Sequence, residues 1–140
     1  MFSSMTKEEI LNFFKDTYYQ VKTFSLNDII ALEGEECVAI GIILSGSVDV
    51  KRMLSNKIIQ MTSFGPGHLF GEVIIFSDVN KYPATVISSS KSEVLFISRE
   101  NFKQFTYTHP DFLEMFLRDL SNKILTLNKS PSISMLIFPP

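Results

Sequence analysis

The residues with the clearest chemical potential lie between Phe64 and Ser88, where two turn signals follow each other closely. Gly65-Pro66-Gly67 is the first signal and Gly71-Glu72 the second, and the apolar run from Val73 to Phe76 has the length of one helical turn. Glycine permits a positive φ or a close backbone approach, and the free amides at a helix start suit an anionic or polar ligand. The stretch predicts either a cradle for a small molecule or two corners of a β-barrel.

The elements that must position this stretch are short strands separated by turn residues. Many short strands at regular spacing are typical of a β-sandwich or barrel, and a jelly roll fits best. We therefore predict a mainly β fold with flanking helices, of the double-stranded β-helix (jelly-roll) type. In this fold the strand that begins at Ala84 follows the predicted cradle. The expected strands are 21–24, 29–32, 38–44, 48–51, 57–64, 84–87 and 93–97.

Helical patterns flank the strands at both ends of the chain. Thr6 suits the N-cap of a first helix, which we expect to end between Lys15 and Tyr18, and Ser98 suits the N-cap of a helix over 99–105. Pro110 is favourable at the first position of a final, longer helix. A heptad seam runs along that helix through Leu113, Leu117, Leu120, Ile124 and Leu127. The seam predicts a homodimer; the alternative is an amphipathic helix docked wholly on its own domain.

Composition places the chain among ordinary globular proteins. It has 140 residues, 45% of them hydrophobic, and a formal net charge of -2, which argues against a dominant nucleic-acid surface. Its single cysteine, Cys37, excludes an intrachain disulfide and suits a reducing compartment. Neither a membrane-spanning apolar run nor a secretory leader pattern is present. We expect one cytoplasmic domain.

Catalytic and metal-binding patterns are missing from the sequence. It contains neither a Gly-x-Ser-x-Gly elbow nor a Gly-Lys-Ser/Thr phosphate loop, and His68 and His109 are its only histidines. One cysteine cannot hold an iron–sulfur cluster, and the flanking acids Glu35 and Glu36 are expected to make the Cys37 thiol less reactive. We predict no catalytic residue, no metal site and no cofactor.

Several segments, in order, resemble the sensory half of the Crp–Fnr family of bacterial transcription regulators. N-D-I-I-A-L-E-G-E-E-C-V-A-I-G-I-I-L-S-G-S-V-D-V resembles the start of a cyclic-nucleotide-binding-type β-roll, and F-G-P-G-H-L-F-G-E-V-I-I-F its phosphate-binding cassette. S-R-E-N-F, then H-P-D-F-L and a long helix, complete a match over about residues 10–128. The resemblance implies an effector-binding domain over 1–109, a dimerisation helix over 110–128, and a small effector between cassette and helix.

Two departures from the family pattern bear on the effector. Cyclic-nucleotide binders carry an arginine and a serine or threonine where this chain has Tyr82-Pro83, and a neutral phenol cannot replace a bidentate guanidinium on a phosphate. Leu127 and Asn128 stand where cyclic-AMP regulators place a Thr-Ser pair. We expect an uncharged aromatic or carboxylated organic effector, the alternatives being a cyclic nucleotide or a ligand-free structural or interaction module. The predicted effector-binding residues are Phe70, Gly71, Glu72, Val73, Tyr82, Pro83, Ala84, Thr85, Leu127 and Asn128.

The last residues, 129–140, do not match the family. Full-length relatives continue into a helix-turn-helix domain that binds DNA, whereas this chain reads K-S-P-S-I-S-M-L-I-F-P-P, with Pro131 unable to continue the helix smoothly. We expect this chain alone to bind no operator sequence specifically. A truncated or frame-shifted regulator and a stand-alone sensor both remain as interpretations.

Overall fold

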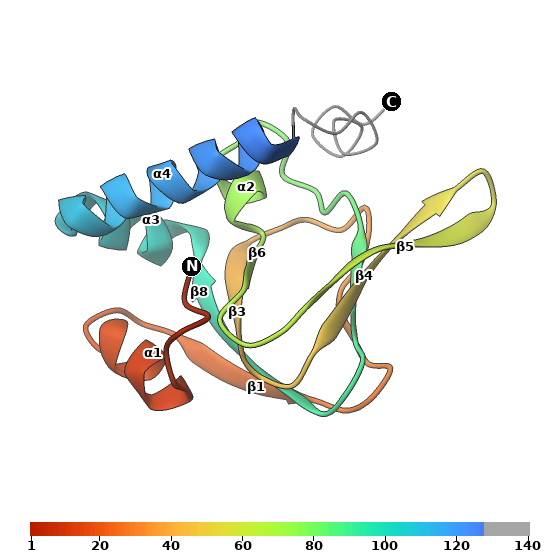
Figure 1. Cartoon of the computed structure of the whole chain (residues 1–140), viewed down its shortest axis with the longest axis horizontal. Helices are drawn as coiled ribbons and strands as arrows, with labels where there is room; N and C mark the ends of the chain where they lie inside the picture. The colour runs from red at the N-terminus through yellow and green to blue at the C-terminus, as the bar shows by residue number, and fades with distance from the viewer. Residues whose placement is uncertain (128–140) are drawn as a thin grey trace. The chain divides into compact units, whose positions relative to one another are not determined.

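The computed structural model describes residues 1–127. They form two compact units, residues 1–104 and the part from residue 105 onward (Figure 1). α3 (Arg99–Thr108) crosses the boundary between them, and α4 (Pro110–Leu127) belongs to the second unit. The other elements, all in the first unit, are α1 (Lys7–Phe13), β1 (Gln20–Phe24), β2 (Ile29–Ala31), β3 (Ala39–Ser45), β4 (Val48–Leu54), β5 (Lys57–Phe64), β6 (Leu69–Phe70), α2 (Glu72–Ile75), β7 (Thr85–Ser88) and β8 (Ser92–Ser98).

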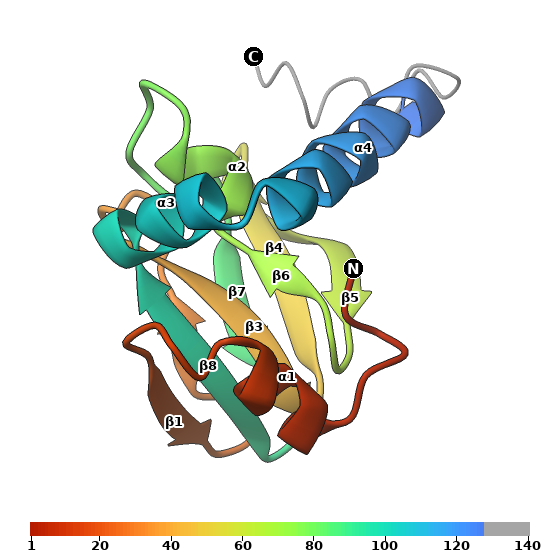
Figure 2. The same ribbon diagram turned by 90° about the vertical axis from the view of Figure 1, so that its left-hand side faces the viewer.

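The strands of the first unit form two four-stranded antiparallel sheets. Their orders are β1-β8-β3-β6 and β2-β7-β4-β5, so most neighbours in a sheet are distant in sequence (Figure 2). Side chains from both sheets meet in one apolar core, and the aromatic rings of Phe70 and Phe96 pack edge to face within it at 6.2 Å. The predicted jelly roll is confirmed. The core residues are Ala31, Ile43, Val48, Phe70, Val86 and Val94.

Local sequence explains most of the elements, although several boundaries differ from expectation. β4 continues to Leu54 because its pairing with β5 persists to Leu54↔Lys57, closed by a turn in which Ser55 and Asn56 both have positive φ. β6 was not predicted, since two residues are too few to show an alternating pattern. α1 ends at Phe13, before the expected 15–18 segment.

A capping box starts α1, and its N-cap is Thr6, as predicted. The Thr6 hydroxyl accepts from the Glu9 backbone N–H at 3.1 Å, and the Glu9 carboxylate accepts from the Thr6 N–H at 3.0 Å. Lys7 then pairs with Glu93 of β8 at 2.8 Å, and the Ser45 hydroxyl donates to the same carboxylate at 3.0 Å. The hydrogen bond from Lys7, followed by that from Ser45, lowers the pKa of Glu93. These contacts tie α1 to the β-roll.

A network of serine hydroxyls joins two chain reversals at one end of the β-roll. The turn between β3 and β4 contributes Ser47, whose hydroxyl lies 2.7 Å from that of Ser89 and 3.2 Å from that of Ser90. Ser92, which is fully buried, donates to the Ser47 carbonyl at 3.1 Å, and Ser88 donates to the Ser90 carbonyl. The serine-rich segment 88–92 therefore cross-links the β3–β4 and β7–β8 turns.

The helices after the β-roll begin where the sequence predicts. Ser98 caps α3 by accepting from the Asn101 N–H at 3.1 Å, and α3 continues to Thr108 rather than stopping at residue 105. Within the second unit, the His109 ring stacks on Phe105 at 4.0 Å and its carbonyl accepts from the Leu113 N–H at 3.0 Å. No helix in the described part of the chain is long and apolar enough to cross a membrane.

Candidate functional site

The turn from β6 into α2 is built around Gly71. Gly71 adopts φ 87°, a left-handed conformation, and caps α2, whose amides at Ile74 and Ile75 both donate to the Gly71 carbonyl at 3.1 Å. A Cβ at this position would lie 3.1 Å from the Ala39 carbonyl oxygen and 3.2 Å from the Cys37 sulfur. Both the backbone angle and the close neighbours therefore require glycine here.

Two loops pair beside this turn and fix the position of Tyr82. The Gly34 N–H donates to the Tyr82 carbonyl at 2.9 Å, and the Tyr82 N–H donates to the Glu35 carbonyl at 2.9 Å. Further along, the Cys37 N–H donates to the Asn80 carbonyl at 2.7 Å. The same antiparallel arrangement includes a bridge between residues 36 and 81. The backbone, rather than the phenol, thus sets the direction of the Tyr82 side chain.

Tyr82 packs on the apolar core and hydrogen-bonds with Cys37. Burial is the main cause that raises the pKa of the Tyr82 phenol, and the hydrogen bond with Cys37 raises it further. The Cys37 thiol is fully buried, 3.4 Å from the Ala39 carbonyl oxygen and 3.9 Å from that of Gly71. Tyr82 is therefore a neutral phenol beside the Cys37 thiol, and it supplies no positive charge next to the cassette.

Phe70 fills the core beneath the cassette. Its ring lies over Gly41 of β3, where a Cβ would come within 2.1 Å of the Phe70 Cζ atom. The ring also packs edge to face with Phe96, at an interplanar angle of 87°. Because Gly41 has no side chain, the Phe70 ring fits into the space above it.

Several of the predicted effector-binding residues lie at the start of α2 and at the start of β7. Glu72 is buried at the first position of α2, and the Thr85 hydroxyl accepts from the Glu33 N–H at 3.0 Å. Val73 is 61% exposed and Pro83 is also exposed, so these two lie at the surface of the cassette. Phe70, Gly71 and Tyr82 lie as described above, and Ala84 is half-buried beside Thr85.

The predicted contribution of the long helix to the effector site stays a prediction, because α4 belongs to the second compact unit. Leu127 is the last residue of α4, in the second compact unit, and Asn128 lies outside the described residues, as do residues 129–140. Of the predicted dimer seam, Leu117 and Ile124 are 53% and 49% exposed, and Leu113 and Leu120 are half-buried.

Sequence reasoning missed the place of Cys37 in this site. In the sequence Cys37 stands out only as a thiol flanked by acids, whereas its side chain is enclosed between Ala39, Gly71 and Tyr82. The sequence feature that could have indicated this enclosed position is that Cys37 comes just before the buried strand β3. His68 instead stacks on Phe64 at 5.2 Å, and among residues 1–127 no three His, Cys, Asp or Glu side chains are arranged to hold a metal ion.

Replacing Gly71 by alanine is expected to lower the free energy of unfolding by about 1–2 kcal/mol, because a non-glycine residue at positive φ is strained. Chemical denaturation of the two proteins measures the difference. Gly65→Ala is the matched control, since a Cβ there meets nothing within 4 Å. Equal stability of Gly71→Ala and Gly65→Ala would contradict the left-handed turn.

The geometry matches a known family. The sequence profile of the cyclic nucleotide-binding domain family matches residues 21–109, and the chain belongs to that family. No curated protein matches the chain at a significant level. The predicted resemblance is confirmed at the level of family and fold: the matched family is that of the cyclic nucleotide-binding domain, and solved structures with the same fold include transcriptional regulators.

Three solved structures illustrate the likeness. A transcriptional regulator from Thermotoga maritima is 21% identical, over 85% of this chain and 92% of that one, with a TM-score of 0.78. The catabolite activator protein of Thermus thermophilus is 23% identical over 91% of this chain and 61% of that one, with a TM-score of 0.69. The c-di-GMP-responsive global regulator of Xanthomonas campestris is 20% identical over 94% of this chain and 64% of that one, with a TM-score of 0.71. These likenesses show the shared fold.

Proposed function

We propose that this chain is a non-catalytic sensor domain of a Crp–Fnr-type regulator whose effector is not a cyclic nucleotide. The observation that supports the proposal is Tyr82, which the paired loops direct onto the core beside Cys37. An arginine at this position would give a cyclic phosphate a bidentate, charge-assisted partner. A half-buried neutral phenol donates one hydrogen bond and leaves the phosphate charge without that partner.

The chemistry around Tyr82 fits an effector with an aromatic ring or a carboxylate. Tyr82 and Phe96 are partly buried aromatic side chains packed against the core that contains Phe70, while the Tyr82 hydroxyl and the buried Cys37 thiol are the polar groups beside them. Aromatic rings that pack edge to face stabilise such a ligand beyond the area that it buries. In the proposed mechanism the effector shifts the packing of the long helix, and with it the geometry of a homodimer formed through the α4 seam.

A second candidate function is a structural or interaction module with no ligand. It is favoured by the fit of the Phe70 ring over Gly41 and by the packing of Tyr82 against the same core, because both side chains occupy the interior of the β-roll themselves. A ligand that binds only the folded state stabilises it, so thermal melting distinguishes the two functions.

Thermal melting with cyclic AMP, cyclic GMP, cyclic di-GMP and small aromatic acids tests the proposal. A ligand at a hundred times its dissociation constant adds about 2.7 kcal/mol to the stability, which is a readily measured shift. We expect no shift with the three cyclic nucleotides and a shift with an organic acid. Cyclic di-GMP belongs in the panel because the related Xanthomonas regulator responds to it.

The double variant Tyr82→Arg/Pro83→Ser supplies the positive control. It restores the charged and hydroxyl groups, so cyclic AMP is expected to raise its melting temperature, whereas Pro83→Ser alone is expected to behave as the unmodified chain. A cyclic-nucleotide shift in the unmodified chain would overturn the proposed effector class. The absence of any shift across the organic acids would favour the interaction module.

A further inference from the structure

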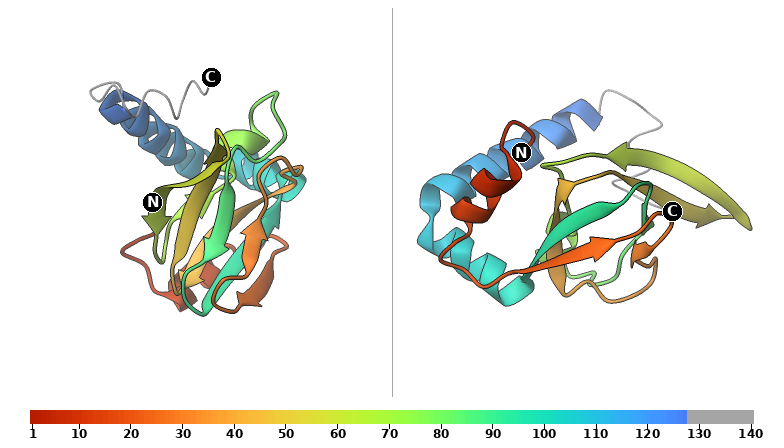
Figure 3. Two further views of the ribbon diagram at one scale, coloured as in Figure 1. Left: turned by 90° about the vertical axis from the view of Figure 1, so that its right-hand side faces the viewer. Right: turned by 90° about the horizontal axis from the view of Figure 1, so that it is seen from below.

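The β4–β5 hairpin projects from the body of the β-roll (Figures 1 and 3). β7 pairs with β4 only over residues 48–51, so the rest of the hairpin, through the Ser55-Asn56 turn, extends past its neighbouring strand. β5 is the last strand of its sheet, and among the described residues no strand pairs with its outer side. Alternate backbone N–H and C=O groups of an edge strand point away from the sheet, where another chain can pair with them.

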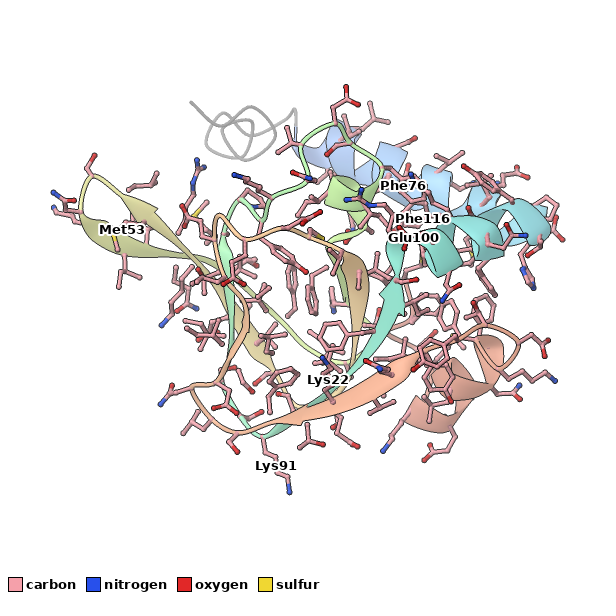
Figure 4. All side chains as sticks on the ribbon, turned by 180° about the vertical axis from the view of Figure 1, so that it is seen from behind. Lys22, Met53, Phe76, Lys91, Glu100 and Phe116 are labelled. Carbon is pink, nitrogen blue, oxygen red and sulfur yellow. The ribbon has the colours of Figure 1, made fainter. Side chains whose placement is uncertain are left out.

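The two faces of this hairpin carry apolar side chains at its exposed end. Met53 and Ile58 are directly opposite each other and are 54% and 69% exposed, and Figure 4 shows Met53 on the projecting segment. Arg52 and Ile59 form the next pair, on the opposite face, and Ile59 is 40% exposed. Several apolar side chains that are this exposed and lie on one short hairpin indicate a contact surface.

The same segment is basic. Residues 51–58 contain Lys51, Arg52 and Lys57 and no acidic residue, in a chain whose formal net charge is -2. Glu33 touches the hairpin from the β4 side, where its carboxylate accepts from the Met53 N–H at 3.1 Å. That contact occupies the β4 edge, so the outer edge of β5, beside Lys57, is the side open to a partner.

We propose that the outer edge of β5 binds an extended, acidic peptide segment of another protein by strand addition. The added strand places apolar side chains on the face of Met53 and Ile58 and carboxylates on the face of Lys57 and Arg52, since side chains alternate along a strand. Backbone hydrogen bonds supply affinity, and the charges select the partner.

Charge also decides between this partner and two others. Pairing of β5 with β5 of a second copy would leave Lys57 without an opposite charge, because β5 contains no acidic residue. An anionic membrane surface would match the charge, but it would leave the outward N–H and C=O groups of β5 without partners away from water. An acidic strand satisfies both the charges and the backbone.

Fluorescence anisotropy with the full chain tests the proposal. The probe is a labelled peptide of about eight alternating glutamate and valine residues, the length of a typical strand. We expect binding that weakens at least about tenfold in Lys57→Glu and in Ile58→Ser. Leu26→Ser, at an exposed apolar residue (59% exposed) of the β1–β2 turn, is the matched control and is expected to bind as the unmodified chain does.

Two further probes identify the mode of binding. Peptides N-methylated at the odd or at the even residues each lose one set of backbone donors, so strand addition predicts that one binds and the other does not. Equal loss in both peptides would overturn strand addition. Vesicles of phosphatidylcholine and phosphatidylserine provide the last arm: binding of the chain to these vesicles without binding to the peptide would also overturn the proposal.

Discussion

Gly41→Ala is expected to lower the free energy of unfolding by about 1–3 kcal/mol, the usual cost of overpacking a core. The added Cβ would meet the Phe70 ring at 2.1 Å, a separation at which the ring must move. The ring cannot move freely, because it is buried and packs against Phe96. Urea denaturation of the variant and the unmodified chain, with the slopes compared, measures the loss.

A double-mutant cycle attributes this loss to Phe70. Phe70→Leu alone removes part of a buried ring and is expected to be destabilising. In that background the alanine at Gly41 has room, so Gly41→Ala is expected to cost much less than in the unmodified chain, giving a coupling energy of about 1 kcal/mol or more. Additive losses would show that the strain of the Gly41 variant arises elsewhere in β3.

The double variant Leu117→Glu/Ile124→Glu is expected to weaken the proposed homodimer by at least about a hundredfold in Kd. Burying one such aliphatic side chain contributes about 1.5–3 kcal/mol, each protomer loses two, and a hundredfold change corresponds to about 2.7 kcal/mol. Both residues lie on the α4 seam and are about half exposed, so charges there do not disturb a buried core. Sedimentation velocity over a concentration series measures the change.

Leu125→Glu provides the control for this experiment. Leu125 is 63% exposed and adjacent to Ile124, but it lies off the heptad seam, so its substitution is expected to leave the dimer intact. A monomeric unmodified chain would refute the dimer itself. Equal weakening by both changes would show that the association uses a different face of α4.

Much of the fold could be predicted because its signals are local. The Thr6 cap, the Ser98 cap and the Pro110 helix start depend on residues within a few positions of each other, and all three are observed. The buried strand β3 follows from one continuous apolar run, and its burial from Ile40 to Leu44 agrees. β6 was missed because two residues contain no periodicity, and its strand character depends on pairing with β3.

The site was predicted less completely, because its geometry depends on loops that are distant in sequence. The positive φ of Gly71 follows from a glycine at a turn, whereas the Cys37–Tyr82 contact requires the pairing of residues 34–37 with 80–82. No local pattern around Cys37 indicates that pairing. Likewise, the need for glycine at position 41 is evident only once the pairing of β6 with β3 places the Phe70 ring over it.

The serine network gives the β-roll two unlike ends. At one end, hydroxyl and backbone groups of Ser47, Ser89 and Ser92 hold the chain reversals together, and Ser88 and Ser92 are buried. At the other ends of β3 and β7 lie the Cys37 and Tyr82 loops, which meet the cassette. The serine network thus fixes one end of these strands. We expect any displacement that an effector causes to be smallest at the serine end and largest at the cassette. Sensing in such a design requires one immobile end as much as one adaptable end.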